Sequence, residues 1–240
     1  MSIVHAKDTP YTWGYYGELS PIFLNYVSAL NGHHPVPLED SFSYCDLGCG
    51  FGVTTNGLAQ LFPQGQFTGI DFNEDQITTA TELAKDCGST NVEFMALDIN
   101  HVTDAELPQY DFIVLHGLFS WVDPGTRDNI RKFVADHLKA DGLVYVSYNC
   151  MPGWAALAPL RDVVLTHTAG MTTDNLIKTQ AGLDYLDFMA TNNAAFFVDN
   201  PPAREFLEEI KSKDIEYVTH ELFVDSSKAY YFHQVAAEMR

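Results

Sequence analysis

Short apolar runs alternate with helical patterns along residues 44–148. Five of these runs are nearly continuous in apolar residues and are predicted to be strands: residues 44–47, 67–70, 92–96, 111–115 and 143–148. Strands that are apolar on both faces are typical of parallel sheets covered by helices. The pattern therefore predicts an α/β fold with a doubly wound, Rossmann-like parallel sheet, which binds ligands at the carboxyl ends of its strands.

Start and stop signals define the helices between these strands. Asn73 is positioned to cap the helix that follows the second run, and Gly88 to end it. Asp123 and Pro124 are typical of the start of the helix that precedes the fifth run. Residues 140–142, Ala-Asp-Gly, are predicted to turn into that last strand.

Helical spacing continues on both sides of this core. Before it, apolar residues recur at the spacing of one helix face: Leu19, Phe23, Tyr26, Val27 and Leu30. We expect this helix to begin near Pro21, to stop at Gly32 and to pack on the core. The expected organisation is an N-terminal aromatic flap and helix (1–38), a ligand-binding core (39–154) and a mostly helical C-terminal part (155–240).

The aromatic segment before this helix allows two interpretations. Its aromatic residues are Tyr11, Trp13, Tyr15 and Tyr16, broken by Gly14 and Gly17. Ordinary core packing explains them, and so does a flap that closes over a ligand.

The chain is strongly acidic, with 32 Asp and Glu against 13 Lys and Arg and a net charge of -19. Such a surface repels phosphate backbones and anionic lipids, which disfavours nucleic-acid partners. Solubility alone explains the charge, and the alternative is a basic partner such as a lysine-rich protein surface.

The sequence shows no targeting or metal signal. Neither a signal-like apolar segment at the amino terminus nor a run long enough to span a bilayer is found, so we expect a cytoplasmic protein without membrane insertion. The four cysteines form no C-x-x-C pair, and His33 with His34 lacks further ligands. Reduced thiols and no metal site are expected.

A glycine-rich stretch follows the first predicted strand and reads Y-C-D-L-G-C-G-F-G. Gly48, Gly50 and Gly52 lie where a buried strand must turn sharply into a helix, and they let a ligand approach the backbone closely. Asp71 ends the second strand about 20 residues later, at the position of a ribose-binding carboxylate. A dinucleotide fingerprint requires a third glycine where this chain has Val53, which makes an NAD-dependent enzyme a distant alternative.

The run D-x-G-x-G-x-G, with Asp46 before its first glycine, resembles motif I of the class I S-adenosylmethionine (SAM) dependent methyltransferases. The resemblance implies that the glycine loop receives the methionine part of SAM and that Asp71 binds the ribose. It also implies that Phe72 covers one face of the adenine and that Asp98 accepts from the adenine amino group. The product would be S-adenosylhomocysteine.

By the resemblance and by position at the strand ends and in the flap, the candidate cofactor-binding residues are Tyr11, Tyr16, Asp46, Gly48, Cys49, Gly50, Gly52, Asp71, Phe72, Leu97, Asp98, Ile99, His116, Gly117 and Trp121.

Three residues are candidates for catalysis: His116, Tyr15 and Asn149. Methyl transfer is an in-line displacement that needs an aligned, unprotonated nucleophile. His116 or a nearby carboxylate is therefore a candidate to take the acceptor's proton, although a histidine at the end of a buried strand is often only hydrogen-bonded to the backbone. Aromatic rings such as that of Tyr15 attract a cationic sulfonium.

A narrower resemblance covers most of the chain. The segments Y-T-W-G-Y-Y-G-E-L-S-P, H-G-L-F-S-W-V and V-S-Y-N-C-M-P-G-W resemble a bacterial subgroup whose methyltransferase domain is joined to a methyltransferase regulatory domain. Some rickettsial members methylate lysines on outer-membrane proteins. The acceptor predicted here is a protein lysine or a small-molecule nitrogen, oxygen or carbon nucleophile. The alternative is a SAM-binding but catalytically silent module for regulation or assembly.

A typical class I domain adds a sixth and a seventh strand as an antiparallel edge of the sheet. Residues 155–240 contain no convincing pair of this kind. Our hypothesis is an incomplete sheet edge, or one that another chain completes, for instance in a homo-oligomer.

Overall fold

The computed structural model describes residues 13–102, 106–223 and 227–240, and the chain forms two compact units. Among the described residues, those from 13 to 148 form the N-terminal unit and those from 149 to 238 form the C-terminal unit. No helix in the described part of the chain is both long enough and apolar enough to cross a membrane.

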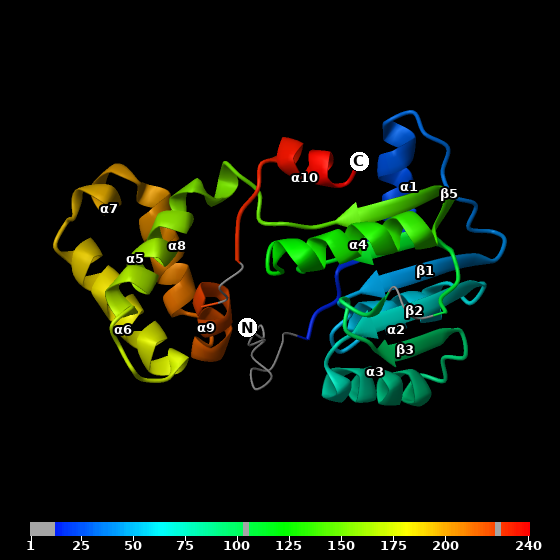
Figure 1. Cartoon of the computed structure of the whole chain (residues 1–240), viewed down its shortest axis with the longest axis horizontal. Helices are drawn as coiled ribbons and strands as arrows, with labels where there is room; N and C mark the ends of the chain where they lie inside the picture. Colours follow the sequence, from blue (N-terminus) through cyan, green and yellow to red (C-terminus); the bar gives the residue numbers. More distant parts are fainter. Residues whose placement is uncertain (1–12, 103–105, 224–226) are drawn as a thin grey trace. The chain divides into compact units, whose positions relative to one another are not determined.

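The N-terminal unit is built on a parallel sheet of five strands (Figure 1). The strands are β1 (Phe42–Leu47), β2 (Gly65–Asp71), β3 (Val92–Ala96), β4 (Tyr110–Leu115) and β5 (Leu138–Val146). Their order is β3-β2-β1-β4-β5, and every neighbouring pair is parallel. The chain winds outward in both directions from β1 and β4, which confirms the predicted doubly wound, Rossmann-like fold. Between these two strands lies the switch point at which such sheets bind ligands.

Three helices of this unit follow strands, as the alternation predicts: α2 (Val53–Leu61), α3 (Glu74–Asp86) and α4 (Pro124–His137). The side chain of Asn73 accepts hydrogen bonds from the backbone N–H groups at the start of α3, and Asp123 does the same for α4. Both predicted caps are confirmed.

Alternate side chains of β1 point to opposite faces of the sheet and build two cores. Phe42 and Tyr44 pack with Leu58 of α2 on one face. Cys45 and Leu47 pack with apolar side chains of α4 on the other face. Because β1 is buried on both sides, its end and the loop that follows are held firmly in place.

The first helix, α1 (Pro21–Leu30), forms where it was predicted but buries the opposite face. Four residues expected in the core are exposed: Phe23, Tyr26, Val27 and Leu30. Asn25 faces inward instead, and its amide donates to the Val36 carbonyl at 2.7 Å and accepts from the Val36 N–H at 2.9 Å. These two bonds hold α1 against the segment around Val36. They also satisfy the buried amide of Asn25, which would cost free energy if it had no partner.

Strand β5 departs from the prediction at both ends. It begins at Leu138, where the expected helix was still running, and it ends at Val146 rather than at residue 148. Leu138 pairs with Tyr110, and pairing then resumes between Leu143 and Phe112. The predicted turn is therefore an irregularity within the strand, where Asp141 has a φ of 63°.

The C-terminal unit is helical in its described residues. Its helices are η3 (Gly153–Ala156), α5 (Ala158–Thr168), α6 (Asn175–Thr191), α7 (Ala195–Asp199), α8 (Pro201–Lys211), α9 (Ile215–Phe223) and α10 (Phe232–Glu238). Apolar side chains from α5 to α9 form one core of their own, with Val164 and Leu207 completely buried. A short 3₁₀ helix, η1 (Gly17–Leu19), precedes α1 in the other unit.

Candidate cofactor site

The glycine loop connects β1 to α2 at the switch point of the sheet. Gly48, Gly50 and Gly52 all have positive φ angles, of 79°, 55° and 64°. L-residues with a side chain rarely adopt such angles, so this loop needs glycine at all three positions. At Gly52 an added Cβ would also lie 2.6 Å from the Phe94 ring.

The loop is bound to the end of β2. The N–H of Gly50 donates to Oδ2 of Asp71 at 3.0 Å, and the other carboxylate oxygen accepts from the N–H of Asn73 at 3.0 Å. The N–H groups of Gly48 and Cys49 donate to the carbonyl of Ile70. Since these amides already have acceptors, we expect a ligand to be held by the loop's shape, its carbonyl groups and nearby side chains.

Asp46 lies beneath this loop and is almost completely buried. Its carboxylate accepts a hydrogen bond from the Thr55 hydroxyl at 2.6 Å. Burial raises the pKa of Asp46 from 3.8 to about 6; the Thr55 bond lowers it and the charge of Asp71 raises it further. A cationic ligand beside this carboxylate would favour its charged form.

The N-terminal segment is attached to the glycine loop and to the first turn of α2 by three contacts. The N–H of Tyr16 donates to the Thr54 hydroxyl at 3.1 Å, and that hydroxyl donates to the Gly14 carbonyl at 3.3 Å. The rings of Trp13 and Phe51 are stacked, with centroids 4.9 Å apart. A cleft lies at this junction, and its walls include Gly14, Tyr16, Asp46, Gly50, Thr54 and His116. The segment therefore packs against the loop and the start of α2, which both the flap and the packing interpretation allow.

His116 follows β4 and forms part of the wall of this cleft. Its ring lies 4.0 Å from the Tyr16 ring, centroid to centroid. Among the described residues, its buried Nδ1 has no hydrogen-bond partner. Burial lowers the pKa of His116 below 6.5, although the charge of Glu18 acts in the opposite direction. The His116 ring therefore lies in the wall of the cleft with one buried nitrogen that has no partner among the described residues.

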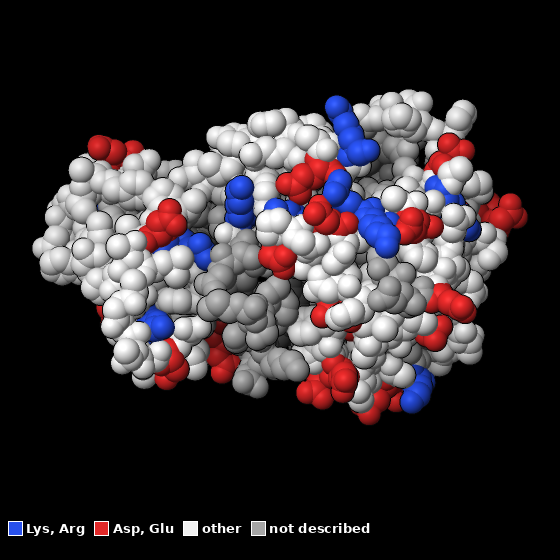
Figure 2. Space-filling view, in the orientation of Figure 1, with Lys and Arg blue, Asp and Glu red and all other residues white. Residues whose placement is uncertain are grey.

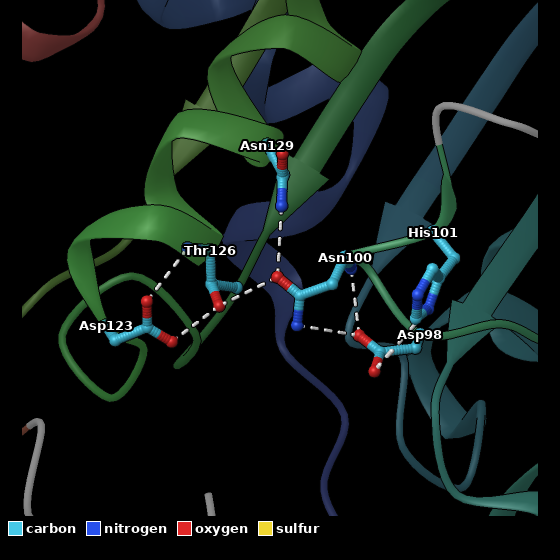
Figure 3. Close-up of polar contacts among 6 residues, drawn as sticks. All are labelled: Asp98, Asn100, His101, Asp123, Thr126 and Asn129. Atoms are coloured by element: carbon cyan, nitrogen blue, oxygen red, sulfur yellow. Dashed lines mark hydrogen bonds and ion pairs between the residues drawn. The ribbon is translucent and has the colours of Figure 1, made fainter. Parts of the chain in front are cut away.

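Two predicted adenine residues lie at the ends of β2 and β3. Phe72 is 41% exposed. Asp98 is exposed and belongs to a turn, in which its Oδ1 accepts from the backbone and side-chain nitrogens of Asn100 (Figure 3). Its neighbours Leu97 and Ile99 pack partly into the core, and the Leu97 N–H donates to the carbonyl of Asp71.

Three other predicted site residues make contacts with neighbouring parts of the N-terminal unit. The Gly117 N–H donates to the Ser147 hydroxyl at 2.7 Å, and the Trp121 N–H donates to the Leu118 carbonyl. Tyr15 is 51% exposed, and its ring lies over Gly57 of α2.

One predicted residue belongs to the C-terminal unit, and another is not described by the structure. Asn149 is part of the C-terminal unit, where its carbonyl accepts from the Tyr230 N–H. Tyr11 lies outside the described residues. In the described ranges, no group of three His, Cys, Asp or Glu residues could hold a metal ion.

Sequence reasoning missed Phe51, Thr54 and Thr55, which the structure places around the loop. Thr54 and Thr55 fall in the first turn of α2, where threonine is usually interpreted as a local helix-start residue. The available signal was their position directly after the glycine run, on the helix that must face the ligand.

A doubly wound sheet with a glycine loop and an acid at the next strand end defines a nucleotide-type cofactor domain. Residues 38–169 match the methyltransferase domain family, over more than half of the chain. The chain belongs to this family, which confirms the class predicted from the glycine run.

Relatives agree with this assignment. An uncharacterized protein of Synechocystis is 39% identical over 98% of this chain, which spans 46% of that protein. PKMT2 from Rickettsia typhi, solved in complex with AdoHcy, is 28% identical with a TM-score of 0.79, and the match covers 96% of this chain and 44% of PKMT2. A malonyl-[acyl-carrier protein] O-methyltransferase of Bacillus cereus is 31% identical over 45% of this chain and 37% of the enzyme. The chain thus spans less than half the length of these three proteins.

Proposed function

We propose that the chain binds SAM in the cleft beside the glycine loop and transfers its methyl group to a nucleophile. The observation that carries this proposal is the bond between Gly50 and Asp71, which joins the ends of β1 and β2 into one surface at the switch point. The family match and the similarity to PKMT2, whose structure holds AdoHcy, support the same cofactor.

The residues present fit such a cofactor. Asp71 lies at the end of β2, beside the glycine loop to which it is bonded, and a carboxylate at this strand end is placed to accept from ribose hydroxyls. Asp46 supplies negative charge beneath the part of the cleft that would receive the cationic methionine end. Phe72 and Asp98 would bind the adenine, by its face and its amino group.

In the reaction, a lone pair of the acceptor forms a bond to the methyl carbon while the carbon–sulfur bond breaks. The sulfur keeps the electron pair, and the acceptor loses its proton if it is an amine or hydroxyl. His116 is the candidate to take that proton, because burial favours its neutral imidazole, which is the form that can accept a proton. The Tyr16 ring beside it presents an aromatic face, which attracts cations.

The acceptor that we favour is a lysine side chain of a basic protein. Acidic residues outnumber basic ones by 32 to 13, and they are spread over the face seen in Figure 2 rather than gathered at one place. Such a surface attracts lysine-rich partners at long range and repels nucleic acid. The resemblance to a subgroup that includes rickettsial lysine methyltransferases points the same way.

The proposal is tested by measuring AdoHcy formation from SAM with a lysine-rich protein and, separately, with small amines. Mass spectrometry then locates any methyl group that is added. Methylated lysines support the favoured acceptor, whereas turnover with small amines alone would replace it. Binding of SAM without turnover on any nucleophile would instead indicate a catalytically silent module.

A further inference from the structure

Helix α1 carries a second apolar face, opposite the one that packs on the core through Leu24 and Asn25. Its five large apolar side chains are between 42% and 68% exposed. We call these residues the outer face of α1: Ile22, Phe23, Tyr26, Val27 and Leu30. Residues three and four apart on a helix are neighbours, so these side chains form one stripe along its length. A helix that is apolar on both sides is typical of one that is covered on both sides.

The outer face of α1 differs from the other exposed apolar residues in being continuous. No other helix in the described ranges exposes more than three large apolar side chains. Single exposed apolar residues are normal on a protein surface, whereas a contiguous apolar patch marks a site of interaction. Of the surfaces that the structure describes, this face is therefore the one best suited to bind another protein.

The distribution of charge along the chain indicates which partner fits this face. Residues 19–38, which include all of α1, contain no Asp, Glu, Lys or Arg, although the chain has a net charge of -19. Two copies of so acidic a chain repel each other wherever their carboxylates meet. An uncharged stripe is where they can touch without that repulsion. A basic partner would instead favour a face with carboxylates of its own, which this stripe lacks.

The area of the outer face suits pairing between two copies. Covering a Phe or Tyr side chain completely removes about 150–250 Å² from water. At their exposed fractions, the five side chains together offer about 400–500 Å² in each copy. Two copies would therefore bury about 1,000 Å², which is the lower limit for a specific interface and typical of weak, reversible association.

We propose that two copies of this chain pair through the outer faces of their α1 helices. A symmetric pair brings the same face of each copy together, so the stripe of one copy meets the stripe of the other. Tyr26 lies in the middle of the stripe and therefore nearest to the two-fold axis. The contact joins helices, unlike the sheet-edge pairing expected from the sequence. None of the cleft-lining residues belongs to α1, so this inference does not rest on the proposed function.

The test is sedimentation velocity of the full chain at concentrations from about 1 to 300 μM. We expect the mass to rise from 26.8 kDa toward twice that value, with a midpoint at tens of micromolar. Raising the sodium chloride concentration should strengthen the pairing, because salt screens the repulsion between two acidic chains and leaves an apolar contact intact. A contact held by ion pairs would weaken instead, which would contradict the inference.

Two variants, Tyr26→Glu and Leu30→Glu, place a carboxylate on the stripe, against the equally acidic second copy. Each should weaken the pairing about tenfold or more. Leu61→Glu is the matched control, because Leu61 is 65% exposed at the end of α2 and should pair like the wild type. Thermal unfolding checks that each variant is folded.

Three results would overturn the inference. The first is a chain that stays monomeric over the whole concentration range, which would leave the outer face of α1 to a different partner. The second is a dimer that neither Tyr26→Glu nor Leu30→Glu weakens. The third is equal weakening by Leu61→Glu, because added charge alone would then explain the effect.

Discussion

The carboxylate of Asp71 accepts a hydrogen bond from the backbone N–H of Gly50, at 3.0 Å and across 21 residues of sequence. This bond joins the loop after β1 to the end of β2, so the glycine loop and the acid that we propose binds the ribose form one unit. Because Asp71 is also bound to the N–H of Asn73, its two oxygens face two backbone donors.

Asp71→Asn should therefore destabilise the fold even without a ligand. An amide has one oxygen, so one of the two N–H groups would meet an NH₂ group. We expect a loss of about 1–3 kcal/mol in the free energy of unfolding, measured with urea. Asp75→Asn, on the exposed first turn of α3, is the control and should change little. Equal stability of both variants would contradict the described role of Asp71.

Gly52→Ala and Gly88→Ala separate steric clash from backbone strain. Both glycines have positive φ, of 64° and 68°. An alanine Cβ at Gly52 would lie within 3 Å of Phe94 and Ala80, whereas nothing lies within 4 Å at Gly88. We expect Gly88→Ala to lower the free energy of unfolding by about 1 kcal/mol. Gly52→Ala should lower it by about 1–3 kcal/mol more, because of the steric clash. Equal losses in chemical denaturation would show that the loop has room for a side chain.

Asp46 makes stability depend on pH. Its folded pKa of about 6 exceeds 3.8, so the folded state holds a proton that the unfolded state has lost, and stability falls as pH rises through this range. The full change corresponds to about 3 kcal/mol, of which about half lies above pH 5. Relative to Asp46→Asn, the wild type should lose about 1.4 kcal/mol of unfolding free energy between pH 5.0 and 7.5. A constant difference would contradict the raised pKa.

Removing the stack between the Trp13 and Phe51 rings tests whether the N-terminal segment closes the cleft. If it does, Trp13→Ala should accelerate AdoHcy release in stopped-flow measurements. A double-mutant cycle with Phe51→Ala should give a coupling of about 0.5–1.5 kcal/mol. Tyr26→Ala, on the exposed face of α1, is the control and should leave the release rate unchanged. Unchanged release in Trp13→Ala would favour the packing interpretation of this segment.

Most of the sheet could be predicted because its signals are local. Continuous apolar runs gave β1 to β4, and the caps Asn73 and Asp123 gave the starts of two helices. The buried face of α1 could not be predicted, because both faces of that helix carry apolar residues. The buried face of α1 is the one that carries Asn25, whose side chain forms two hydrogen bonds with the backbone of Val36, eleven residues away.

The candidate site also has a part that the sequence predicts and a part that depends on tertiary contacts. The glycine run and Asp71 were evident from their spacing along one strand–helix–strand unit. The contacts of Asp98 with Asn100 and Asn129, and of Tyr16 with Thr54, depend on how distant elements meet. Glycine and carboxylate positions are set by local backbone geometry, whereas polar links between elements are set by the packed fold.

We propose that an adenosyl cofactor binds beside the glycine loop and contacts Asp71 at the end of β2. The most direct measurement is calorimetric titration of the chain with SAM, AdoHcy and NAD. We predict micromolar binding of the two adenosyl compounds in preference to NAD, and loss of that binding in Asp71→Ala. No binding of either compound, or tighter binding of NAD, would contradict the account.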